Sequence, residues 1–353
     1  MKSFDEVFID STKHCTKIKT DQYHEKGKYI IIDQGQSEIA GYTDLENGLF
    51  SDVPAIIFGD HTRVIKYIDE PFFIGADGVK VLKSKLENAN YKYLFYALKN
   101  AKIPNTGYNR HFKWLKETKI NYPDNEKQAE IVSFLDKLQS IITHRKQQLA
   151  KLDELVKARF VEMFGNGNYP NVCIGEVLIQ NTTVEKIIDT KTEKYVTVGI
   201  RGTGARERII KDGKYPVPFS GYRVKSGQFI YSRIDARNGA FALLSDDLNN
   251  AVVSKDFPVF DINQNKIIPF MLLFSVLQDS FVKQIQNSSF GATNRQRIKE
   301  EVFSKYKIAL PPLDLQNQFA AFVRQVDKSK VAVQKALDEA QLLFDSLMQE
   351  YFG

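Results

Sequence analysis

The chain has 353 residues, 43% of them apolar and 26% charged, and 49 Lys and Arg against 43 Asp and Glu give a net charge of +6. This composition is typical of a folded protein of two or three domains, and the mild positive charge permits a polyanionic partner without requiring one. No apolar run approaches the roughly 20 residues of a membrane-spanning helix, and the N-terminus lacks the apolar core of a secretory signal. Two cysteines, Cys15 and Cys173, cannot form a disulfide framework. We therefore expect a cytoplasmic protein without a membrane partner.

The first predicted module, residues 1–123, mixes short strands with one helix. Runs rich in β-branched and aromatic residues at 29–32, 55–58 and 78–82 predict strands, because such side chains suit a pleated sheet. The stretch 91–98 that follows predicts a helix. Interspersed strands and helices indicate an α/β module with a mixed sheet.

A long helix is predicted next, over residues 124–165. Its apolar residues recur at alternating spacings of four and three, the pattern of a coiled-coil seam, which Arg145 and Arg159 interrupt. Pro123 limits where the helix can begin, and Gly165 is the kind of residue that closes one. From Glu126 to Met163 the helix would be roughly 57 Å long. The seam residues are Ile131, Leu135, Leu138, Ile142, Leu149, Leu152, Val156 and Met163.

The second predicted module, residues 166–311, repeats the order of the first. Predicted strands at 195–198, 228–231 and 258–260 precede a predicted helix at 270–277. Residues 166–171 are rich in Asn, Gly and Pro and indicate a linker.

A second long helix is predicted over residues 312–353, and it repeats the first. Residues 119–165 align with residues 307–353 at a constant offset of 188, with identities that include Lys119, Pro123 and Gln128. Each helix has one apolar stripe, so the two can bury these stripes against each other. Packed antiparallel, they would form a coiled coil with a module at each end and an approximate two-fold axis, although packing alone would also explain the stripes. The second stripe comprises Phe319, Val323, Val326, Val333, Leu337, Ala340, Phe344, Leu347 and Tyr351.

Motifs of catalysis are missing from the sequence. It has no phosphate-binding G-x-x-x-x-G-K-[ST] loop, no nucleophile elbow and no zinc motif. We therefore predict no catalytic residue, no metal site and no enzyme activity in this chain.

Basic and polar residues concentrate instead in the loops of both modules. Arg pairs with guanine edges, Asn and Gln with adenine, and Lys and Ser with phosphates, so these loops suit duplex DNA. Solvated surface loops are the alternative, since loops are usually polar. A further loop, residues 201–208, holds three arginines, but its G-x-G is a weak match to a nucleotide-binding turn. The predicted DNA contacts are Arg63, Asn109, Arg110, His111 and Lys113 in the first module and Arg233, Arg237, Asn294, Arg295 and Arg297 in the second.

The whole chain resembles the specificity subunit of type I restriction-modification systems. The resemblance rests on the two K-I-x-x-P segments at Lys119 and Lys307, followed by Gln128 and Gln316, and on the helix end LDELVKARFVEMFG. The Phe-Ile-Gly-Ala-Asp-Gly run at 73–78 also matches. One departure is that Asp124-Asn125 stands where the second copy has Pro312-Leu313.

The resemblance implies a non-catalytic DNA reader that acts in phage defence. Residues 1–123 and 166–311 would be target recognition domains, each reading half of a bipartite asymmetric site, and the helices 124–165 and 312–353 would space them. Expected partners are double-stranded DNA, two methyltransferase subunits and, through these, two restriction subunits. S-adenosylmethionine, ATP and magnesium would belong to the partners, with no cofactor in this chain. Two alternatives stay open: a scaffold that binds protein partners only, and the recognition part of a restriction enzyme whose catalytic domains are encoded separately.

Overall fold

The computed structural model describes residues 1–75, 77–107, 109–165, 167, 169–287 and 297–353. It divides into two compact units, Met1–Leu149 with Ala332–Gly353, and Ala150–Val331. The predicted boundaries at 123, 165 and 311 follow the ends of the long helices. The compact units instead cut each long helix near its middle, because the two halves of a helix pack on different modules.

The first unit contains a four-stranded antiparallel sheet in the order β2-β8-β5-β6 and a three-stranded sheet in the order β4-β3-β7, in which β3 and β7 are parallel. The predicted strand at 29–32 is found with the same bounds, and the one predicted at 78–82 extends to Ser84, which pairs with Phe8. Its strands are β1 Lys2–Ser3, β2 Phe8–Asp10, β3 Tyr29–Ile32, β4 Gly41–Thr43, β5 Ala55–Gly59, β6 Ile65–Ile68, β7 Phe72–Ile74, β8 Val79–Ser84 and β9 Lys119–Ile120; its short helices are α1 Phe4–Val7, η1 Thr12–His14, η2 Thr20–Gln22, α2 Tyr91–Lys99 and α3 Phe112–Lys116.

The second unit contains a four-stranded antiparallel sheet, β11-β19-β16-β17, a three-stranded sheet, β12-β15-β18, and the hairpin β13-β14. Its strands are β10 Asn171–Cys173, β11 Leu178–Gln180, β12 Glu185–Ile187, β13 Val196–Val198, β14 Ala205–Glu207, β15 Phe219–Arg223, β16 Phe229–Tyr231, β17 Phe241–Leu243, β18 Val252–Ser254, β19 Val259–Ile262 and β20 Lys307–Ala309; its short helices are η3 Ile174–Glu176, η4 Ala236–Asn238, η5 Asp246–Leu248, α5 Pro269–Val276, α6 Asp279–Asn287 and α7 Glu300–Phe303.

The internal repeat of the sequence is also a repeat of structure. The four-stranded sheets have the same strand order, with β2, β8, β5 and β6 matching β11, β19, β16 and β17. In each unit the first strand pairs antiparallel with the strand that leads into the long helix, β1 with β9 and β10 with β20. The turn after each first strand is closed by the same kind of hydrogen bond. The Glu6 carboxylate accepts from the Ser3 backbone N–H at 2.6 Å, and the Glu176 carboxylate accepts from the Cys173 backbone N–H at 2.9 Å.

The two long helices are α4, Asn125–Phe164, and α8, Leu313–Phe352, and both end one residue before the predicted glycines. In the first unit the Asn121 side-chain amide donates to the Tyr351 carbonyl at 3.3 Å, so the start of α4 lies beside the end of α8. In the second unit Lys330 Nζ lies 2.6 Å from Asp153 Oδ1, and the ring of Phe319, earlier on α8, lies 5.5 Å from that of Phe160, later on α4. Within each unit the helices therefore run antiparallel.

The predicted seam residues of both helices are buried or partly buried. Those of the first unit, Val333 excepted, join a core with Phe4, Phe58 and Leu94 of the sheet and helices, and those of the second join a core with Phe229 and Leu272. Each half of the helix pair thus packs on one module. The buried seam residues are Ile131, Leu135, Ile142, Val156, Phe319, Val323, Val326, Val333, Leu337 and Phe344, and the partly buried ones include Leu138, Leu149, Leu152, Met163, Ala340, Leu347 and Tyr351.

A buried glutamine fastens the start of each long helix. Gln128 and Gln316 are both fully buried, and the side-chain amide of each donates at 2.8 Å to the carbonyl of the proline five residues earlier, Pro123 or Pro311. Gln316 makes two more bonds: its Oε1 accepts from the backbone N–H of Ile268 and its amide donates to the Lys266 carbonyl. Gln128 Oε1 has no hydrogen-bond partner among the described residues.

We predict that Gln316→Ala destabilises the protein more than Gln128→Ala. The first change leaves two carbonyls and an N–H without their partners, and the Pro311 carbonyl among them is buried, so it should cost about 2–4 kcal/mol. The second loses one bond and also removes an unpartnered oxygen, and should cost about 1 kcal/mol. Urea unfolding followed by circular dichroism measures both, and equal losses would contradict the prediction.

Candidate nucleic-acid interface

In the first unit the turn after β5 gathers the predicted DNA contacts. The backbone carbonyl of Asp60 accepts from the His111 N–H at 2.8 Å, and the Asp60 carboxylate accepts from the Phe112 N–H at 2.7 Å. A ring nitrogen of His61 lies 3.2 Å from the Asn109 carbonyl. These bonds hold the segment before α3 against the turn between β5 and β6, so residues about 50 positions apart meet at one end of the sheet.

Four of the five predicted residues here keep some exposed surface. Arg110 and Lys113 are exposed, with the Lys113 ammonium 4.2 Å from the Trp114 ring centroid. The Asn109 side-chain amide is already bonded to Thr106 within its own loop. Arg63 is partly exposed, and one of its guanidinium nitrogens donates to the Ile103 carbonyl at 3.3 Å.

His111 differs from the expectation of a contact residue. Its side chain has no exposed surface, and one ring nitrogen is within 3.0 Å of the Asp60 carbonyl while the other lies 3.5 Å from Thr106 Oγ1. A ring without exposed surface cannot touch DNA, so this arrangement assigns His111 to holding the segment that carries Asn109 and Arg110.

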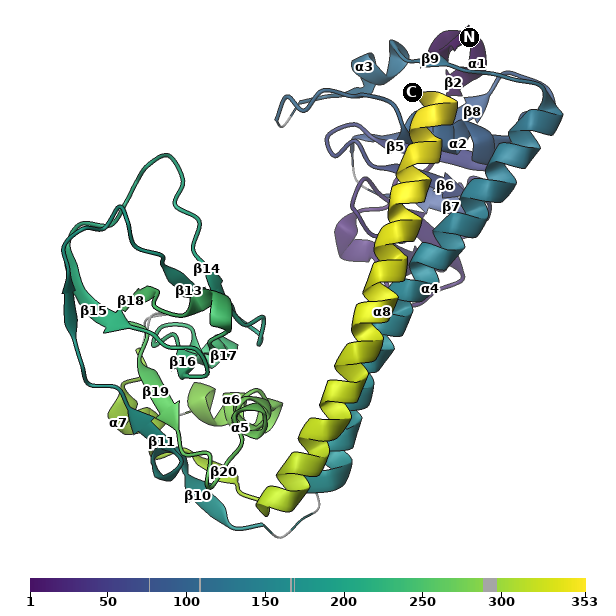
Figure 1. Cartoon of the computed structure of the whole chain (residues 1–353). Helices are drawn as coiled ribbons and strands as arrows, with labels where there is room; N and C mark the ends of the chain where they lie inside the picture. The colour runs from purple at the N-terminus through teal and green to yellow at the C-terminus, as the bar shows by residue number, and fades with distance from the viewer. Residues whose placement is uncertain (76, 108, 166, 168, 288–296) are drawn as a thin grey trace. The chain divides into compact units, whose positions relative to one another are not determined.

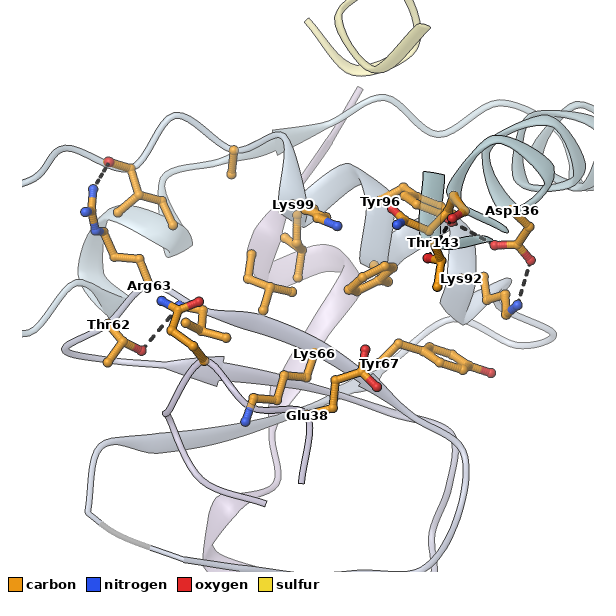
Figure 2. A pocket seen from close by; sticks show the side chains of 18 residues that line it. Glu38, Thr62, Arg63, Lys66, Tyr67, Lys92, Tyr96, Lys99, Asp136 and Thr143 are labelled. Atoms are coloured by element: carbon orange, nitrogen blue, oxygen red, sulfur yellow. Dashed lines mark hydrogen bonds and ion pairs between the residues drawn. The ribbon is translucent and has the colours of Figure 1, made fainter. Parts of the chain in front are cut away.

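A groove of about 810 Å³ opens beside the same turn, between β6, α2 and α4 (Figure 2). Asp136 of α4 accepts from the Tyr96 hydroxyl at 2.7 Å and pairs with Lys92 at 2.6 Å, and both partners belong to α2. Burial, followed by the bond to Asp136, raises the pKa of Tyr96. These groups couple α2 to α4 and so fix the module on the helix.

In the second unit the turn after β16 takes the same place. The backbone carbonyl of Arg233 accepts from the Ile298 N–H at 2.9 Å, which matches the bond between Asp60 and His111. The Arg233 guanidinium, however, is bonded to the carboxylate of Glu300, which is 11% exposed, and is itself only 22% exposed. Burial lowers the pKa of Arg233, but the bond and charge of Glu300 outweigh it and raise the net pKa. Arg233 therefore supports the turn in this structure and is not free to contact DNA.

The other predicted residues of the second module differ from one another. Arg297 pairs with Asp256 at 3.2 Å and keeps 58% of its side chain exposed. The carbonyl of Arg237 accepts from the Gln286 amide, and its guanidinium has no bond to a described residue. Asn294 and Arg295 lie outside the described residues.

The sequence did not reveal the acids that fix these loops. Asp60, Asp256 and Glu300 each hold a segment or a side chain that is distant in the chain, and nothing in the local pattern marks them. Among the described residues no helix is both long and apolar enough to cross a membrane, and no group of three or more His, Cys, Asp or Glu side chains is placed to hold a metal ion.

Comparison with known proteins finds type I restriction specificity domains and subunits. A family model described as the type I restriction modification DNA specificity domain matches residues 1–154 and again residues 166–340. The specificity subunit of the Escherichia coli type I restriction enzyme EcoR124I/EcoR124II is 29% identical over 143 residues, which are 37% of this chain and 35% of that protein. The HindI specificity subunit of Haemophilus influenzae is 27% identical over 135 residues, or 36% of this chain and 29% of that protein. The matches thus span about a third of each relative.

Two solved structures share the fold. The S subunit of a type I restriction-modification system from M. genitalium has a TM-score of 0.58 at 15% identity and covers 100% of this chain and 95% of its own. A chain from a structure of type I restriction-modification complex assembly has a TM-score of 0.53 at 13% identity and covers 100% of this chain and 99% of its own. Because the family model covers most of the sequence in two copies, the chain belongs to the type I restriction-modification DNA specificity family.

Proposed function

We propose that this chain is the non-catalytic DNA-recognition subunit of a type I restriction-modification complex. Each module would read one half of a bipartite, asymmetric site. The observation that carries the proposal is the repeated turn after β5 and β16, which in both units is bonded to a distant segment of the chain and gathers basic side chains at one end of the four-stranded sheet. Arginine and asparagine are the residues that read guanine and adenine edges, so such a cluster in each module suits two separate half-sites.

The long helices would act as the spacer between the half-sites. Each is 40 residues long, and in each unit the two run antiparallel with their seam residues buried or partly buried. A continuous antiparallel coiled coil would give the molecule a fixed separation and a pseudo-two-fold axis. That separation would set the distance between half-sites along DNA, which repeats every 34–36 Å.

The outer faces of the helices supply a surface for protein partners. On α4, Phe134, Ile141 and Leu155 are 47%, 44% and 47% exposed and lie at multiples of seven residues, on one face of the helix. On α8, Leu342 is 72% exposed. We assign these faces to docking of two methyltransferase subunits, with two restriction subunits joining through them. S-adenosylmethionine, ATP and magnesium would be bound by those partners, in the cytoplasm.

The test begins with the complex that a tagged full-length chain forms in its own cells. We expect two methyltransferase chains per tagged chain, and selection from random-sequence duplexes should enrich a two-part motif with a fixed spacer. DNA affinity should fall steeply as salt rises, because phosphate contacts release counterions. A complex that binds partners but shows no salt-dependent affinity for DNA would favour the scaffold function instead.

Arg110→Ala is expected to weaken DNA binding in that complex. If Arg110 reads a base, preference at one position of the first half-site should fall by about 1–3 kcal/mol, and if it contacts a phosphate, all sequences should weaken alike with a shallower salt slope. Lys26→Ala is the control, since Lys26 is an exposed cation of the same module that is not among the predicted contacts. Unchanged affinity and salt slope in Arg110→Ala, and likewise in Arg295→Ala, would remove these residues from the interface.

A further inference from the structure

Two arginines of this chain hold a backbone conformation that arginine rarely adopts. Among the described non-glycine residues, positive φ is found at Arg63, Asn88, Arg201, Asp212 and Asn250. Asn and Asp tolerate the left-handed region, whereas a longer side chain there costs on the order of 1 kcal/mol. Glycine would remove that strain at no steric cost, but it would also remove the guanidinium.

Arg201 lies on a turn that is fastened on both sides. It belongs to the turn between β13 and β14, near β16 and β17 (Figure 1). Its N–H donates to the Asn238 carbonyl at 2.8 Å, and the Gly202 N–H donates to the Gly239 carbonyl at 3.0 Å. On the other side, a Cβ at Gly202 would meet Leu277 at 2.9 Å. The backbone of Arg201 is therefore fixed against the loop that carries Arg237.

The side chain of Arg201 is exposed and makes no hydrogen bond or ion pair with a described residue. Arg233 and Arg297 of the same module are instead bonded to carboxylates, as described above. A fixed backbone with a free guanidinium suits a contact of defined geometry, because only the side chain, and not the turn that carries it, remains to be ordered on binding. A phosphate contact makes no such demand, since a flexible cation serves as well.

We propose that Arg201 is a specificity-determining residue of the second module, whose guanidinium reads a guanine edge in the major groove of the second half-site. This inference rests on the proposed DNA-reading function and adds to it a residue outside the predicted contact set. The planar fork of arginine matches the two acceptors of guanine, whereas glycine offers no donor there and lysine offers a point charge without the fork geometry.

The test compares the motifs that wild-type, Arg201→Gly and Arg201→Lys complexes select from random-sequence duplexes. In both variants we expect guanine preference at one position of one half-site to fall by about 5- to 150-fold, with the rest of the motif unchanged. The melting temperature of Arg201→Gly should be unchanged or slightly higher, because glycine relieves the strain. Asn250→Gly, which changes another left-handed residue of this module, should alter no position of the motif.

Each outcome separates this inference from the function on which it rests. An unchanged motif in Arg201→Gly, or a uniform loss of affinity across all sequences, would overturn base reading by Arg201 while the wild-type motif stands. A wild-type complex that enriches no motif would overturn the DNA-reading function itself.

Discussion

Replacement of Phe319 by alanine is expected to lower the free energy of unfolding by about 3–5 kcal/mol, the usual cost of truncating a fully buried phenylalanine. Phe319 has no exposed surface, and its ring centroid lies 5.5 Å from that of Phe160, 5.6 Å from Phe164 and 5.2 Å from Phe274. These rings come from α8, α4 and α5, so the change would open a cavity where three helices of the second unit meet. Urea unfolding followed by circular dichroism measures the loss.

Phe134→Ala provides the control for this measurement. Phe134 is also on a long helix but is 47% exposed, so its truncation should change stability by no more than about 0.5 kcal/mol. If the two variants lose similar stability, the packing of Phe319 between the three helices does not contribute to the free energy of unfolding as its burial implies.

The long helices could be predicted almost residue by residue, because every signal for them is local. The seam spacing, the prolines and the closing glycines all lie within the segments that they define, and α4 and α8 end at Phe164 and Phe352 as expected. The strand at 29–32 was as readily predicted, since its run of one aromatic and three β-branched residues suits a strand, and the structure buries three of the four. The spacing of apolar residues and the positions of proline and glycine were sufficient to predict these elements.

The pairing of strands could not be predicted in the same way. β2 pairs with β8 and β5 with β6, but β3 pairs with β7 in parallel, and no local pattern selects among such partners. The two modules also differ in this respect: the three-stranded sheet of the first includes a parallel pair, whereas that of the second is antiparallel throughout. The four-stranded sheet is thus the shared framework, and the smaller sheets are where the modules diverge.

The sequence predicted which loops form the candidate interface, but not which of their residues are exposed and which support the loops. His111 and Arg233 have the same chemistry as exposed contact residues, and only their partners, Asp60 and Glu300, show that His111 is a buried support and Arg233 a partly buried one. Those partners lie 51 and 67 residues away in the sequence. The sequence marked the loop that carries Arg201 as basic, but its left-handed backbone could not be predicted, since it depends on a turn docked against another loop.

Removal of one heptad from both long helices is expected to shorten the spacer of the recognised DNA site and leave both half-site sequences unchanged. Deleting residues 143–149 of α4 with residues 331–337 of α8 keeps the seam in phase, because the repeat is seven residues. At 1.5 Å per residue the helices lose about 10 Å, which equals about three base pairs at 3.4 Å each. Mapping of methylated adenines in cells that carry this variant measures the new spacer.

The twist of DNA adds a second expected effect, on the strength of binding. Three base pairs rotate one half-site by about 100° relative to the other, since a turn takes 10–10.5 base pairs, whereas removal of a heptad rotates the helix pair very little. We therefore expect a shorter spacer together with weaker binding, because the DNA must be twisted to present both half-sites. Shortening α4 alone is the control, since it leaves unmatched seam residues in α8 and should destabilise the chain without defining a new spacer. Altered half-sites with an unchanged spacer would refute the role of the helices as the ruler, because the modules would then set the distance themselves.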